Sequence, residues 1–472
     1  MSLDKQIAKN TVIHLAGKLI SLILGLVAIA VMARYLGQEG FGYYITVTAF
    51  LQFFGILVDF GLTLTTVQMI SKPGVNISRT MNSIISFRVI TAFCFLLLAP
   101  ILIWFFPYNI FIKLGVIITV ASFFCITIIQ TLTGVFQQKL KMFKLTLAEV
   151  IGRVVFVALV VLAAWLGKNI YWIFGAMSIG SIVNLVIVFL YSKKYIKWRL
   201  EFDFTIWKEL ISKTWPIALS ISFNLIYLKM DIIILSLFRS QGEVGLYGAT
   251  YRVVDILTML PAVFMGIVLP IATKYYLEKN KKELRAILQK SFDALMIFAV
   301  PITIGTFVIA EKIMIFIAGA EFIPSGEILK VLILASCAIF ATSLFAYAVV
   351  AVNRQKTMMW GYLTVAVLTL VGYFIFIPKY GYWGAAWMTV FSEALIMIWT
   401  AVLIYRAIKF FPSLKTFLKT IPAAIIMSGV LYSVRSWHVL ILLMIAGVVY
   451  FGFLYLFGGI RKETIQEFVK LK

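Results

Sequence analysis

The chain has 472 residues, of which 62% are hydrophobic and 13% are charged, and its mean hydropathy is +1.03. These values exclude an ordinary soluble globular protein and indicate a membrane protein. The formal net charge of +23 would also suit a nucleic-acid-binding protein, so the positions of the Lys and Arg residues have to decide between the two.

Apolar runs of about 20 residues or more recur along the chain, and each can cross roughly 30 Å of hydrocarbon as a helix. We expect an all-α, polytopic membrane protein with about 14 transmembrane helices, the first of them retained rather than cleaved as a signal peptide. The predicted helices are 11–35, 41–70, 80–106, 109–135, 145–167, 170–192, 215–238, 245–273, 291–318, 326–352, 357–377, 382–409, 416–434 and 437–458.

Lys and Arg are distributed unevenly between the two sides of the membrane. With the N-terminus inside, 29 of them fall in inner segments and 7 in outer loops. This positive-inside asymmetry predicts that both termini are cytoplasmic. It also explains the net charge without nucleic acid, because basic inner segments are expected to contact anionic lipid headgroups.

Two parts of the sequence return in altered form about 200 residues later. Residues 171–181 resemble 382–392 at a shift of 211, and the loop after the first helix returns at a shift of 203. At that second shift the matched pairs are Gln38 with Gln241, Gly42 with Gly245 and Tyr44 with Tyr247. Because six helices separate the copies, the duplication predicts two six-helix bundles in a pseudo-two-fold parallel repeat, with a cleft between them and two additional C-terminal helices.

The predicted domains follow from this repeat. They are an N-terminal bundle (1–194), an amphipathic cytoplasmic linker (195–214), a C-terminal bundle (215–410), and two extra transmembrane helices with a basic tail (411–472). We expect the linker to contain a short interfacial helix on the inner surface, with a solvated loop as the alternative. The last two helices either cover a flank or form a groove for an apolar tail.

Five cations are predicted at membrane depth, where they are costly unless they face water or a partner. They are Lys18, Arg88, Arg153, Lys229 and Arg252. We expect them to line a water-filled cleft and bind an anionic group of a substrate, since such a group needs positive charge to enter a low dielectric. Lys330 lies near an outer helix end and can extend to the interface instead.

Three of these cations also have a structural interpretation. Lys18 shares one helix face with His14 and Ser21, and it could extend to the interface rather than face a cavity. Arg88 has no carboxylate within one helical turn. Two others have a carboxylate three or four residues away, which allows an ion pair within the helix. These pairs are Glu149 with Arg153 and Arg252 with Asp255.

Three carboxylates lie deep within predicted membrane helices. Asp231, Asp255 and Glu393 are candidates for binding H+ or Na+, with structural pairing to nearby cations as the alternative. Asp59 and Asp293 lie near inner helix ends, where interfacial or capping roles are expected. The sequence contains no nucleotide-binding loop, catalytic constellation or metal-ligand spacing, so we predict that the chain is not an enzyme and has no catalytic residues, metal or cofactor.

Several motifs resemble those of one transporter family. The segments ARYLGQEGFGYY and VDFGL in the first helix pair, and later QQKLKMFK, VGLYGATYRVVD and NRQKTMMW, resemble polysaccharide flippases of the Wzx type. These belong to the multidrug/oligosaccharidyl-lipid/polysaccharide (MOP) exporter superfamily. The resemblance implies a bacterial or archaeal cytoplasmic membrane protein that moves a polyprenyl-diphosphate-linked oligosaccharide, such as an O-antigen unit, by alternating access. It also implies membrane lipids and polysaccharide polymerases as partners.

Two other functions remain open at this point. A drug/cation antiporter of the same superfamily would favour an acidic, aromatic cavity, whereas the intramembrane charge here is mainly cationic. A membrane-embedded polysaccharide polymerase or ligase would need a large outer loop rich in Arg or His, whereas every predicted outer loop is short.

Overall fold

The computed structural model describes residues 3–72 and 74–459, and most of them are α-helical. The α-helices are α1 (Leu3–Asp59), α2 (Leu62–Ile70), α3 (Ile77–Leu102), α4 (Ile110–Gln138), α5 (Met142–Trp165), α6 (Ile170–Ser192), α7 (Phe204–Phe238), α8 (Gln241–Leu277), α9 (Lys281–Ala318), α10 (Pro324–Ala351), α11 (Gln355–Tyr380), α12 (Tyr382–Ile408), α13 (Lys415–Ser433) and α14 (Val439–Leu456). Two short 3-10 helices, η1 (Ile103–Phe105) and η2 (Ala320–Phe322), lie between them.

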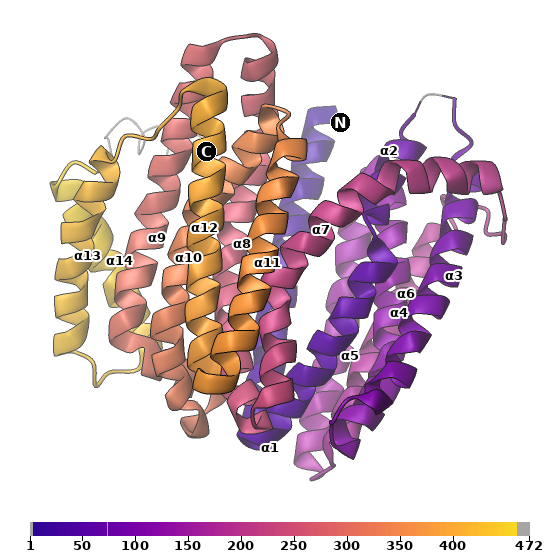
Figure 1. The fold of residues 1–472 in the computed structure, drawn as a ribbon, viewed down its shortest axis with the longest axis horizontal. Coiled ribbons are helices and arrows are strands. Elements are labelled where there is room, and N and C mark those ends of the chain that lie inside the picture. Colours follow the sequence, from indigo (N-terminus) through magenta and orange to yellow (C-terminus); the bar gives the residue numbers. More distant parts are fainter. Residues whose placement is uncertain (1–2, 73, 460–472) are drawn as a thin grey trace. The chain divides into compact units, whose positions relative to one another are not determined.

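Twelve helical segments of the described chain are long and apolar enough to span a membrane, which confirms the predicted fold class. The first, Ala16–Asp59, has 44 residues, about twice the length that one crossing needs. Gly37 interrupts it with φ 66° and ψ −174°, so α1 contains the predicted helix 11–35 and most of the predicted helix 41–70. Figure 1 shows the two arms of α1 meeting at the lower end of the view. The predicted helix 215–238 is the C-terminal part of α7.

The chain divides into two compact units, Met1–Gly245 and Leu246–Lys472. The duplication assigns α7 to the second repeat, yet α7 packs on α1, α2 and α3 within the first unit. The predicted boundaries at 194 and 214 describe the repeat in the sequence and stay a prediction. The end of the predicted basic tail, after residue 459, lies outside the described residues.

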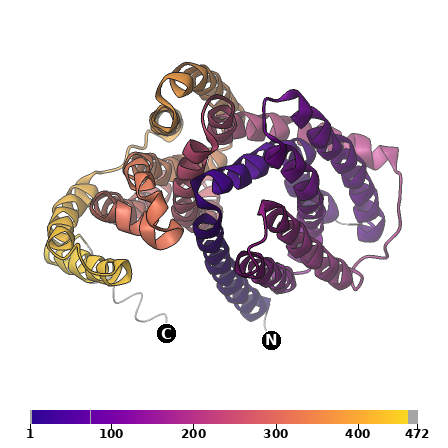
Figure 2. The ribbon, with the colours of Figure 1, turned by 90° about the horizontal axis from the view of Figure 1, so that it is seen from below.

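The two C-terminal helices cover a flank of the second unit. A buried cluster that includes Ala423, Met427 and Leu442 joins α13 and α14 to α9. Tyr450 of α14 also donates a 2.8 Å hydrogen bond to the carbonyl of Ile297 in α9. Figure 2 shows α13 and α14, in yellow, at the edge of this unit beside α9.

Only the second part of the predicted linker (195–214) is helical. Residues 196–203 have no regular secondary structure, and α7 begins at Phe204. The Asp203 carboxylate caps this helix by accepting from the amides of Thr205 and Ile206 at 3.0 and 3.2 Å. Leu210 in the first part of α7 packs against Leu62 of α2 and Ile84 of α3. The segment in which the sequence predicted an interfacial helix therefore forms the first part of α7, and its position at the membrane surface stays a prediction.

Asp203→Ala should loosen this start of α7. The hydrogen bond from Ile206 and the Arg79 guanidinium, 2.8 Å away, lower the pKa of Asp203 and so favour the charged form that caps the helix. Without the cap, amide exchange in the first turn should rise about three- to tenfold. Hydrogen–deuterium exchange mass spectrometry measures this change. Thr205→Ala, which leaves the carboxylate in place, is the control and should change exchange far less.

Candidate functional site

The helix break between α1 and α2 is held by a buried arginine. Phe60 and Gly61 adopt left-handed conformations, with φ 44° and φ 78°, so the backbone leaves the helix after Asp59. The side chain of Arg88 reaches this break from α3. Its Nη1 donates to the carbonyl of Val58 at 2.8 Å, where α1 ends. A cation at a helix C-terminus is favourable because the exposed carbonyls carry partial negative charge.

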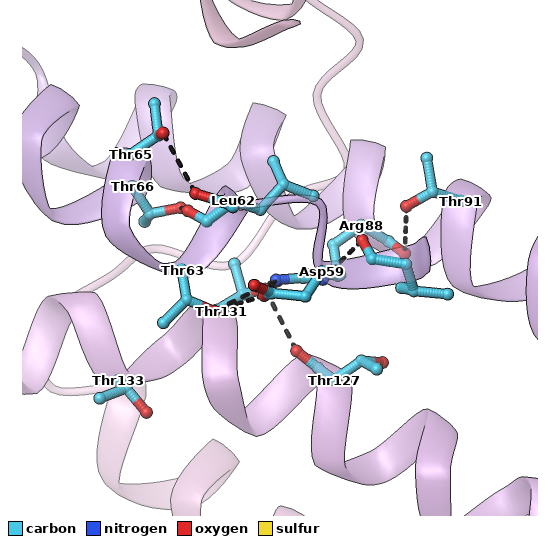
Figure 3. Close-up of polar contacts among 12 residues, drawn as sticks. Asp59, Leu62, Thr63, Thr65, Thr66, Arg88, Thr91, Thr127, Thr131 and Thr133 are labelled. Carbon is cyan, nitrogen blue, oxygen red and sulfur yellow. Dashed lines mark hydrogen bonds and ion pairs between the residues drawn. The ribbon is translucent and has the colours of Figure 1, made fainter. Parts of the chain in front are cut away.

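The rest of the Arg88 guanidinium is also engaged. Nη2 lies 2.6 Å from the Asp59 carboxylate, and Nε donates to Thr131 of α4 at 2.7 Å. Thr63 of α2 donates to the same Asp59 oxygen at 2.5 Å. Figure 3 shows the Arg88 and Asp59 side chains pointing toward one another, with Thr63 and Thr131 beside them. This one side chain therefore joins α1, α2, α3 and α4.

Arg88 was predicted to line an open cavity, but it does not, because none of its side chain is exposed. Asp59, which was expected to be interfacial or to cap a helix, is its ion-pair partner. The cation is tolerated inside the protein because a carboxylate, a carbonyl and a hydroxyl satisfy it. This geometry fits the stabilisation of a helix break rather than direct contact with a substrate.

A polar seam joins the first arm of α1 to α5. His14, Lys18 and Ser21 lie on one face of α1, as their spacing predicted, and this face contacts α5. His14 bonds to the hydroxyl of Thr146, while Lys18 Nζ lies 2.6 Å from Glu149 Oε2. The Lys18 side chain remains 47% exposed, which makes it an accessible cation.

Glu149 pairs across this seam rather than along its own helix. Ser21 donates to Glu149 Oε1 at 3.0 Å, so both carboxylate oxygens bond to α1. Within the described residues Arg153 forms no ion pair, and its side chain is partly exposed. The in-helix pair that the spacing allowed is therefore absent from the described structure, and Arg153 is a second accessible cation of the first unit.

In the second unit, Arg252 and Asp255 of α8 form the predicted pair at a distance of 3.9 Å. Their side chains are 33% and 39% exposed, so the pair is loose and open. Lys330, expected to reach the interface, lies 2.5 Å from Glu327 at the start of α10.

The remaining predicted site residues lie at different depths of burial. Lys229 of α7 is partly exposed. Asp231, two residues later, is fully buried and accepts from the amide of Ile232 at 2.8 Å. In the second unit, Glu393 of α12 is 2% exposed, and its Oε1 has no hydrogen-bond partner among the described residues.

An apolar cavity of about 770 Å³ lies within the second unit, among α9, α10, α12 and α13. Phe292, Met296, Phe345, Met397 and Phe417 are among its lining residues, and Tyr405 lies at its wall. A cavity of this composition suits a hydrocarbon chain. In the described part of the chain, no group of three His, Cys, Asp or Glu side chains could hold a metal ion.

The duplicated loops contact one another at the bend of α1. A Cβ atom built on Gly42 would lie 1.8 Å from the carbonyl oxygen of Gln241, and one built on Gly245 would lie 2.0 Å from that of Gln38. Thr46 Oγ1 also donates to Gln241 Oε1 at 2.7 Å. The duplication in the sequence matches Gln38 with Gln241 and Gly42 with Gly245, but it does not indicate that the two copies touch.

The fold is that of the MurJ and MATE membrane transporters. The chain is similar to lipid II flippase MurJ in an inward closed conformation, with a TM-score of 0.79 and 19% identity over 94% of this chain and 98% of that one. It is also similar to an inward-facing multidrug resistance MATE family transporter of the MOP superfamily, with a TM-score of 0.64 and 13% identity over 84% and 98% of the two chains.

The chain belongs to the polysaccharide biosynthesis protein family, whose model matches residues 7–276. A relative in Haloferax volcanii, named "Probable low-salt glycan biosynthesis flippase Agl15", is 24% identical over 258 residues. That alignment covers 52% of this chain and 53% of the relative, so it spans about half of each. The family assignment confirms the one that the sequence motifs suggested.

Proposed function

We propose that this chain is a flippase that moves a polyprenyl-diphosphate-linked oligosaccharide from the inner to the outer leaflet during surface polysaccharide biosynthesis. The observation that carries the proposal is the exposure of four cations that the sequence predicts at membrane depth. Lys18 and Arg252 expose 47% and 33% of their side chains, and Arg153 and Lys229 are partly exposed. Family membership supports a role in polysaccharide biosynthesis, and the Haloferax relative is named as a probable flippase of glycan biosynthesis.

The chemistry of the cargo matches these features. A diphosphate in a low dielectric needs compensating cations, which Lys18, Arg153, Lys229 and Arg252 would supply. The apolar cavity of the second unit would hold part of the polyprenyl tail, because hydrocarbon gains free energy by leaving water. In this proposal Arg88 acts indirectly, by fixing the break between α1 and α2.

An ion gradient is the proposed energy source, with H+ or Na+ as the coupling ion. Asp231, Asp255 and Glu393 are the candidate ion-binding carboxylates. The buried position of Glu393 and its unbonded oxygen support this role, since a buried carboxylate gains most from binding a cation or a proton. The positive-inside asymmetry supports an orientation with both termini cytoplasmic, in a cytoplasmic membrane where polysaccharide polymerases would be partners.

Lys18→Gln and Arg252→Gln are expected to lower translocation about tenfold each, since each removes one charge-assisted contact to the diphosphate. The measurement uses proteoliposomes with a lipid-linked oligosaccharide and scores the sugar that becomes accessible on the opposite side, with and without a pH or sodium gradient. Lys330→Gln at the start of α10 is the control and should transport normally.

The same assay separates the other candidate functions. Transport of organic cations without any movement of the lipid-linked sugar would indicate a drug antiporter. Joining of glycans by the purified protein would indicate a polymerase or ligase. Unchanged translocation in both variants would contradict the assignment of these cations to the substrate site.

A further inference from the structure

Lys18 is the accessible cation of the polar seam, and Glu149 is its ion-pair partner. Its Oε2 lies 2.6 Å from Lys18 Nζ, and Ser21 orients Oε1 from 3.0 Å. Because 47% and 26% of the two ion-paired side chains are exposed, a ligand can reach the pair without unfolding the seam. The carboxylate therefore sits where an oxygen of an anionic ligand would bind Lys18.

A second cation lies one helical turn further along α5. Arg153 follows Glu149 by four residues, the spacing at which ion pairs form on a helix surface. Within the described residues Arg153 has no ion pair. Glu149 can therefore leave Lys18 for Arg153 by rotating its side chain, and its charge stays compensated.

The backbone around the pair is well fixed. A Cβ atom on Gly17 would lie 2.2 Å from Thr146 Cγ2, so α1 and α5 are in close contact one turn before Glu149. Gly152 is similarly close to α6, where its Cβ would lie 2.7 Å from the carbonyl oxygen of Gly180. Close packing thus fixes the helices on both sides of Glu149, so a change of partner there would involve its side chain alone.

We propose that Glu149 is a placeholder for the anionic substrate. It pairs with Lys18 while the site is empty, and it turns to Arg153 when a diphosphate oxygen takes its place at Lys18. This inference rests on the proposed function and assigns Glu149 a positioning role within it. The exchange leaves no charge uncompensated at membrane depth, and a ligand without negative charge cannot drive it.

The test measures binding of farnesyl diphosphate to the full chain in lipid nanodiscs, with farnesol as the uncharged probe. Glu149→Gln should bind farnesyl diphosphate about two- to fivefold more tightly, because the ligand no longer displaces a carboxylate. Farnesol binding should not change. Translocation of the lipid-linked oligosaccharide should slow, because Lys18 no longer has an internal partner to promote release.

A double-mutant cycle distinguishes competition between Glu149 and the ligand for Lys18 from a general effect of removing one negative charge. In a Lys18→Gln background, Glu149→Gln should no longer strengthen binding. Glu327→Gln is the matched control, since Glu327 also pairs with a lysine, Lys330, at 2.5 Å. It should leave the affinity for farnesyl diphosphate unchanged.

Unchanged or weaker binding by Glu149→Gln would overturn this inference alone if the wild-type chain binds farnesyl diphosphate and translocates the cargo. The inference also fails if the gain persists without Lys18, or if Glu327→Gln gives the same gain. A wild-type chain that neither binds farnesyl diphosphate nor translocates the oligosaccharide would overturn the proposed function, and this inference with it.

Discussion

Arg88→Ala is expected to lower the free energy of unfolding by about 3–5 kcal/mol, the cost typical of removing one partner from a buried ion pair. The substitution leaves the Asp59 carboxylate without its cation and the Val58 carbonyl without the donor at 2.8 Å. The left-handed residues Phe60 and Gly61 would then lose the contact that fixes the break. Thermal unfolding of the purified protein in detergent measures the loss.

Two further variants show whether the loss comes from the pair. Arg252→Ala removes a cation whose partner is 3.9 Å away and partly exposed, so it should cost less than about 1 kcal/mol. Arg88→Met combined with Asp59→Leu leaves no carboxylate unpaired and should be more stable than Arg88→Ala alone. Equal losses of unfolding free energy in Arg88→Ala and Arg252→Ala would show that Arg88 does not stabilise the break between α1 and α2.

Local patterns explain what the sequence could predict. The helices could be predicted from the apolar runs, because a helix that spans hydrocarbon must form its own backbone hydrogen bonds and carry apolar side chains. The spacing of His14, Lys18 and Ser21 defined one face of α1, and the structure confirms that this face is polar. Both signals depend only on residues within one helix.

Contacts between helices were not predictable in the same way. Asp59 and Arg88 are 29 residues apart, and they meet because the chain turns at Phe60 and Gly61. Glu149 had a cation on its own helix but bonds to Lys18, 131 residues away, because α1 and α5 pack closely. Each of these contacts depends on how closely two helices approach one another, and the spacing of residues along the chain does not show this.

Gly42→Ala is expected to be the most disruptive glycine substitution in the first unit. The added methyl group would lie 1.8 Å from the carbonyl oxygen of Gln241, and a backbone atom cannot rotate away as a side chain can. The helices must separate, at a cost of about 3 kcal/mol, near the upper end of what overpacking usually costs. Thermal unfolding and cysteine cross-linking across this contact would both report the change.

Gly25→Ala provides the control on the same helix, because nothing lies within 4 Å of a Cβ atom at that position. It should be neutral or should stabilise α1 by up to about 1 kcal/mol, since alanine has a higher helix propensity than glycine.

Gly245→Ala should behave like Gly42→Ala, because its Cβ would lie 2.0 Å from the carbonyl oxygen of Gln38. These two glycines are the matched pair of the sequence duplication, and each faces the glutamine of the other copy. If Gly42→Ala and Gly245→Ala were both as stable as Gly25→Ala, this contact between the duplicated loops would have to be abandoned. If both are destabilised, the absence of a side chain at these positions follows from how closely the two copies pack.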